Sequence, residues 1–75
     1  MKHRQVLSGL LRELRQQAGL SQEALADKAG LHRTYISQLE RGLKSPTVDV
    51  LDALARALGV TLKMFLAQYA RRLGS

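Results

Sequence analysis

The segment 22–42 constrains the fold of this chain most strongly, because it joins two short helical patterns through one glycine. The first pattern, over 22–29, places Leu25, Ala26 and Ala29 at helical spacing. Gly30 follows, and glycine adopts the positive φ of a tight turn without the steric cost that a side chain adds. The second pattern runs from about 33 to 41 and stops at Gly42. The segment therefore predicts two helices joined by a tight turn.

The second of these helices has two unlike faces. At about 100° per residue, Ile36 and Leu39 fall on one side. Within an arc of roughly 140° on the other side lie Arg33, Thr34, Ser37, Gln38 and Arg41. Arginine can bridge guanine O6 and N7, glutamine can bridge adenine N6 and N7, and threonine can place its methyl against thymine. The pattern is typical of a helix-turn-helix that displays its recognition helix.

Composition sets the outer limits. Seventy-five residues, 45% of them apolar, suffice for one domain, 1–75, with a single small core. The formal charge of +6 favours a polyanionic partner, although a basic membrane-binding helix uses the same charge. The absence of cysteine excludes disulfides, thiolate zinc sites and cysteine nucleophiles. No signal peptide or membrane-spanning run is apparent, so we expect a soluble, cytoplasmic protein.

Three further apolar stripes predict helices over 6–18, 48–58 and 62–73. Side chains suited to cap the second, fourth and fifth helices are those of Ser21, Thr47 and Thr61. The basic segment 1–5 is expected either to fray or to act as an arm that touches phosphate or the minor groove, and 71–75 is expected to fray. The predicted fold is all-α, a single domain of five helices.

An enzymatic function is not supported by the inventory of side chains. The two histidines are widely separated, the acidic residues fit exposed helix faces or caps, and no glycine-rich phosphate loop is present. We therefore expect no catalysis, no cofactor, no metal and no small-molecule ligand.

The resemblance to a known family rests on several motifs in register. They are Leu20-Ser21-Gln22-Glu23-Ala24-Leu25-Ala26, Ala29-Gly30-Leu31, Tyr35-Ile36-Ser37, Leu39-Glu40-Arg41-Gly42, Ser45-Pro46-Thr47 and Ala57-Leu58-Gly59-Val60. Over about 10–66 the chain resembles the Cro/CI-type (XRE-like) helix-turn-helix regulators, most of all phage Cro-like repressors and the controller proteins of restriction–modification systems. This resemblance implies a lambda-repressor-like fold. It also implies a homodimeric transcriptional regulator, for example a repressor, which inserts its third helix in the major groove of a two-fold symmetric operator in double-stranded DNA.

The resemblance also implies roles for individual residues. The base-reading set is Arg33, Thr34, Ser37 and Gln38. The set implied to meet the DNA backbone is Gln22, Arg41 and Lys44, with Tyr35 and His32 as further candidates. The alternative for Gln22 and Lys44 is that they are only solvated, and the alternative for Tyr35 is a half-buried packing residue. At the position of His32 the family usually has Ser, Thr or Asp, and the alternative for His32 is also that it is only solvated.

Two structural pairings are expected. Arg15 and Glu40 match an ion pair that the family often makes between its first and third helices; the alternative is two independent surface charges. The last helix has more apolar surface than the core needs, and we expect Leu66, Tyr69 and Leu73 to form a dimer interface. Alternatively, the C-terminus folds over its own domain or frays.

The main alternative function is a protein-interaction module of the same fold, either antitoxin-like or a polymerase-binding adaptor, because a fold does not by itself establish function. RNA polymerase is also a candidate partner of a DNA-bound regulator. The polar, basic arc of the second helix of the pair favours DNA.

Overall fold

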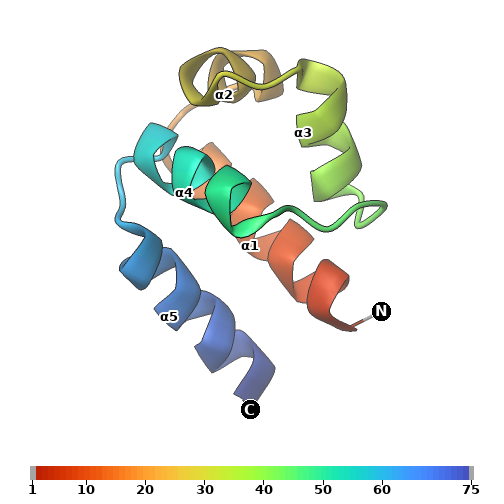
Figure 1. The fold of residues 1–75 in the computed structure, drawn as a ribbon, viewed down its shortest axis with the longest axis vertical. Helices are drawn as coiled ribbons and strands as arrows, with labels where there is room; N and C mark the ends of the chain where they lie inside the picture. The colour runs from red at the N-terminus through yellow and green to blue at the C-terminus, as the bar shows by residue number, and fades with distance from the viewer. Residues whose placement is uncertain (1, 75) are drawn as a thin grey trace.

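A computed structural model describes residues 2–74 and confirms the predicted all-α fold, since every regular element within that range is a helix. Met1 and Ser75, the outermost residues of the two ends expected to fray, lie outside the described residues. The helices are α1 (Lys2–Gln17), α2 (Gln22–Ala29), α3 (Arg33–Glu40), α4 (Val48–Ala57) and α5 (Leu62–Gly74). In Figure 1, α2 and α3 lie at one end of the molecule and α5 at the other, with α1 and α4 between them.

The core consists of two clusters that share α1 and α4. The larger cluster lies beneath the helix-turn-helix and contains Leu11, Leu25, Ala26, Ile36, Leu39 and Leu54. The smaller cluster contains Leu10, Ala55 and Phe65, and Phe65 is fully buried. Adjacent residues of α1 thus belong to the two different clusters, so α3 and α5 both pack on α1.

The turn between α2 and α3 has the geometry that its glycine predicts. Gly30 has φ 70° and ψ 32°, the left-handed region, and its N–H bonds to the carbonyl of Asp27 at 3.3 Å. The N–H of Leu31 donates to Ala26 at 2.9 Å, so two carbonyls at the end of α2 are satisfied before the chain turns. This tight closure fixes how α3 leaves α2.

The predicted helix caps are confirmed. The hydroxyl of Ser21 accepts from the N–H of Ala24 at 3.0 Å, and that of Thr47 accepts from Val50 at 3.2 Å. At α5 the hydroxyl of Thr61 accepts from Met64 at 3.1 Å. Each bond satisfies a backbone N–H that the helix itself leaves unpaired.

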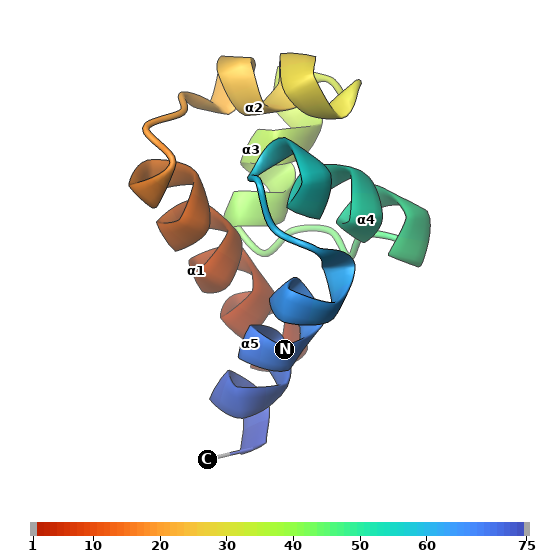
Figure 2. The ribbon, with the colours of Figure 1, turned by 90° about the vertical axis from the view of Figure 1, so that its left-hand side faces the viewer.

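The prediction that the N-terminal segment frays is wrong for the described residues, because α1 begins at Lys2. Two contacts with distant parts of the chain hold this first turn. The ring of His3 bonds through Nδ1 to the hydroxyl of Tyr69, and Arg4 Nε donates to Ser45 Oγ at 3.1 Å. Figure 2 shows the start of α1 next to α5.

The prediction of a fraying C-terminal segment is likewise wrong through Gly74, where α5 ends. Arg72 Nη2 donates to Glu13 Oε2 of α1 at 2.8 Å, which ties the last turn of α5 to the body of the domain. Both ends of the described range, 2–74, are therefore ordered by side-chain contacts between α1 and α5 or between α1 and the loop before α4.

Candidate nucleic-acid interface

The outer face of α3 is positioned by its buried face. Ile36 is fully buried and Leu39 is 2% exposed in the larger cluster, so the helix cannot rotate without losing core contacts. The side chains opposite them therefore face outward: Arg33 and Thr34 are exposed, and Ser37 and Gln38 are half-buried. α3 packs against α1 and α2, and these four side chains lie on the face of α3 that is turned away from both helices.

The candidate phosphate contacts surround this face. Arg41, at the end of α3, and Lys44, in the loop that follows, are both exposed. Tyr35 is half-buried and packs against the larger cluster. His32 is exposed at the N-cap of α3, but its side chain makes no capping hydrogen bond. The start of α3 is therefore held by its backbone and core contacts alone.

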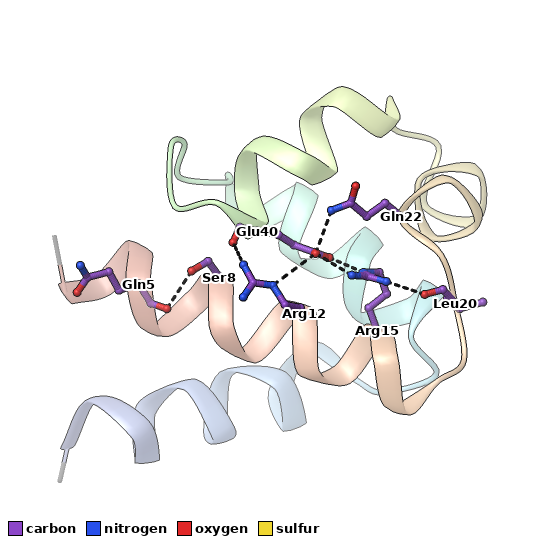
Figure 3. Close-up of polar contacts among 7 residues, drawn as sticks. All are labelled: Gln5, Ser8, Arg12, Arg15, Leu20, Gln22 and Glu40. Carbon is purple, nitrogen blue, oxygen red and sulfur yellow. Dashed lines mark hydrogen bonds and ion pairs between the residues drawn. The ribbon is translucent and has the colours of Figure 1, made fainter.

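Arg15 of α1 and Glu40 of α3 form a two-pronged ion pair beneath α3 (Figure 3). Arg15 Nε donates to Glu40 Oε2 at 2.6 Å, and Arg15 Nη2 donates to Glu40 Oε1 at 3.0 Å. The third nitrogen, Nη1, donates to the carbonyl of Leu20 at 2.9 Å. Glu40 is only 2% exposed, and the hydrogen bond with it raises the pKa of Arg15, although burial opposes that shift. The pair therefore joins α1, the turn before α2 and α3.

Two further residues contact Glu40 in ways that the sequence did not predict. Arg12 Nη2 donates to the backbone carbonyl of Glu40 at 2.6 Å, and its Nε lies 3.9 Å from Glu40 Oε1. Gln22 Nε2 donates to the same Oε1 at 3.1 Å. The contact of Arg12 could have been predicted from its position on the same flank of α1 as Arg15, one turn earlier. The contact of Gln22 could not have been predicted, because a neutral amide carries no charge pattern.

The C-terminal residues expected at a dimer interface differ in exposure. Leu66 is 38% exposed, whereas Tyr69 and Leu73 are half-buried. The expectation that Tyr69 belongs to apolar surface that the core does not need is wrong, because Tyr69 packs against the smaller cluster and bonds to His3. The physical reason is the longer α1, whose added first turn offers Tyr69 a surface.

The Helix-turn-helix family HTH_3 matches residues 11–65. The chain belongs to this family. Its match begins inside α1 and ends at the buried Phe65, so it covers the larger core cluster, all of the smaller cluster except Leu10, and all of α3.

Relatives within the family are regulators of similar or greater length. The chain is 38% identical over 68 residues to control protein C.SmaI of Serratia marcescens. That match covers 91% of this chain and 81% of C.SmaI. The chain is also 41% identical over 54 residues to a helix-turn-helix transcriptional regulator of Mycobacterium tuberculosis. That match covers 72% of this chain but 39% of the longer regulator. The family therefore includes relatives that are named as transcriptional regulators or control proteins.

A solved structure extends the likeness to the whole fold. The restriction–modification controller protein C.Esp1396I superposes with a TM-score of 0.90 and 28% identity, over 100% of this chain and 99% of that one. Solved variants of that controller each replace one residue of a consecutive Arg-Thr-Tyr run. This chain has the same three residue types in the same order at Arg33, Thr34 and Tyr35.

No helix within residues 2–74 is both long enough and apolar enough to cross a membrane.

Proposed function

We propose that this protein is a sequence-specific DNA-binding regulator that acts as a homodimer on a two-fold symmetric operator. The observation that carries the proposal is the outer face of α3. Its buried face fixes the helix through Ile36 and Leu39, and its outer face presents side chains that recognise base edges. In this proposal α3 enters the major groove, and Arg33, Thr34, Ser37 and Gln38 read bases.

Phosphate contacts supply the sequence-independent part of binding. We assign Arg41 and Lys44 to them because both are exposed cations next to the recognition face. Tyr35 and His32 are further candidates on the same side, at the start of α3. Gln22, at the first position of α2, remains a candidate contact, but one of its two N–H groups is already donated to Glu40.

The proposed homodimer uses the face of α5 around Leu66, with Tyr69 and Leu73 on its flank. Leu66 is apolar and 38% exposed, and it borders a cavity of about 160 Å³ whose lining includes Leu7, Pro46 and Leu51. A second copy would cover this apolar surface. Two recognition helices related by two-fold symmetry would then meet successive turns of the major groove.

An adaptor that binds another protein through α3 is expected to present large apolar or acidic side chains there. α3 instead presents Arg33, Thr34, Ser37 and Gln38, so DNA remains the better partner.

The salt dependence of DNA binding tests this proposal. If each subunit neutralises about three phosphates, the log–log slope of affinity against salt for a dimer is roughly −5. Fluorescence anisotropy with a labelled duplex measures the slope. A slope near zero, or no binding at low salt, contradicts the DNA-binding function.

A further inference from the structure

Glu40 contacts more than its ion-pair partner. Its carboxylate is almost fully buried, and its Oε1 accepts both from Arg15 Nη2 at 3.0 Å and from Gln22 Nε2 at 3.1 Å. Arg12 lies against the same carboxylate and also holds the Glu40 carbonyl. Glu40 is therefore fixed from α1, and it contacts the first residue of α2 from the end of α3.

A carboxylate accepts hydrogen bonds and donates none, so it determines which end of a neighbouring amide faces it. A free glutamine amide can turn over, exchanging its oxygen and its NH₂ group with little change in shape. Next to Glu40, the NH₂ group of Gln22 must point inward, and Figure 3 shows the amide oxygen pointing away from Glu40. One N–H and the oxygen of Gln22 are left for a partner outside the domain.

The bond between Gln22 and Glu40 is not needed to neutralise the Glu40 carboxylate or to cap α2. Arg15 already neutralises Glu40 through two hydrogen bonds. The N-terminus of α2 is already capped by the hydroxyl of Ser21. What the bond adds is a fixed orientation for a half-exposed amide at the N-terminus of α2, next to the recognition face.

We propose that Glu40 is a positioning residue for DNA binding, which acts by holding the Gln22 amide with its nitrogen inward and its oxygen outward. This inference rests on the DNA-binding function proposed above. It predicts that Gln22 contacts DNA through a fixed edge of one acceptor and one donor, instead of a freely turning NH₂ group. Arg12 and Arg15 contribute indirectly, because they keep the Glu40 carboxylate in place.

A double-mutant cycle in DNA affinity tests the coupling. Glu40→Gln keeps the size of the side chain but loses the pure acceptor, and Gln22→Met keeps the length but removes the amide. With a duplex that the unmodified protein binds, Glu40→Gln should lower affinity about 2- to 12-fold, the range of one hydrogen bond. In the Gln22→Met background the same change should lower it by a factor close to one.

Equal losses in both backgrounds would overturn the inference, because Glu40 would then act only through the fold. Unchanged affinity in both backgrounds would overturn it as well. Failure of the unmodified protein to bind any duplex would instead contradict the proposed function.

A measurement on the unmodified protein covers the case in which Glu40→Gln does not fold. NMR of the side-chain amides should give Gln22 NH₂ signals shifted away from those of Gln17, which is exposed at the end of α1. A contact between the Gln22 NH₂ protons and Glu40 in nuclear Overhauser spectra supports the inference. Signals like those of Gln17, without that contact, overturn it.

Discussion

Arg15 and Glu40 are 25 positions apart in the sequence and are joined by two hydrogen bonds, of 2.6 and 3.0 Å. The bonds connect the last turn of α1 to the last residue of α3, so the angle between the two helices depends on them. Without a partner, a carboxylate at this place would be a buried negative charge beneath a surface proposed to bind phosphate. The pair thus stabilises the fold and removes an electrostatic conflict with DNA.

Replacing Arg15 by Met should therefore destabilise the protein strongly. The change leaves Glu40 buried without its main partner, and such losses cost about 3–5 kcal/mol. Urea unfolding followed by circular dichroism at neutral pH measures the change in the free energy of unfolding. The matched control is Arg56→Ala, which breaks an exposed pair with Asp52 and should cost roughly 1 kcal/mol or less. Equal effects of the two changes would contradict a structural role for the buried pair.

His32→Ser should stabilise the protein. His32 is the N-cap of α3 but makes no side-chain hydrogen bond there, whereas a serine hydroxyl in this extended backbone can accept from a free N–H of the first turn. The expected gain is about 1 kcal/mol in the free energy of unfolding. Thr47→Ala, which removes an existing cap at α4, should cost a similar amount. If His32→Ser proves neutral while Thr47→Ala destabilises, the start of α3 is already satisfied by its core contacts.

Substitutions of base-reading residues and of phosphate-binding residues should differ in how the loss of affinity depends on the DNA sequence. Arg33→Ala and Gln38→Ala should each lose roughly 1–3 kcal/mol of discrimination at one base pair. Lys44→Ala should weaken all duplexes alike, because a phosphate contact carries no sequence information. Affinities for a panel of single-substitution operators measure the difference. A uniform loss for Arg33→Ala across the panel would reassign Arg33 to the backbone.

Leu66→Asp should convert a dimer into a folded monomer that binds one half-site weakly. Tyr69 is unsuitable for this test, because it packs in the smaller cluster and its replacement would disturb the fold. Met64→Asp is the matched control: Met64 is 52% exposed and lies about 200° around α5 from Leu66. Sedimentation velocity at high micromolar concentration, without DNA, distinguishes the species. A monomeric unmodified protein would refute the proposed interface.

The fold could be predicted from the sequence because its signals are local. Gly30 needs only its own backbone freedom to turn the chain, and Ser21 and Thr47 cap their helices by accepting from backbone N–H groups only three residues ahead. The ion pair of Arg15 and Glu40 is long-range, and only the family resemblance suggested it.

The start of α1 and the end of α5 were predicted incorrectly because contacts between residues far apart in the sequence order them. Polar and basic residues at the ends of a chain are expected to fray, yet His3 bonds across 66 positions to Tyr69. Arg72 bonds across 59 positions to Glu13. The contact of Gln22 with Glu40 was missed for the same reason, since it depends on how α2 and α3 pack.

Selection of binding sites from a random duplex pool tests the central claim most directly, because it assumes nothing about the operator. A homodimer that reads bases through α3 should enrich a two-fold symmetric sequence, with half-site centres about 10 base pairs apart. Arg33→Ala should relax the preference at one position in each half-site. A bound pool that remains as random as the starting pool, with the protein folded, would contradict sequence-specific recognition.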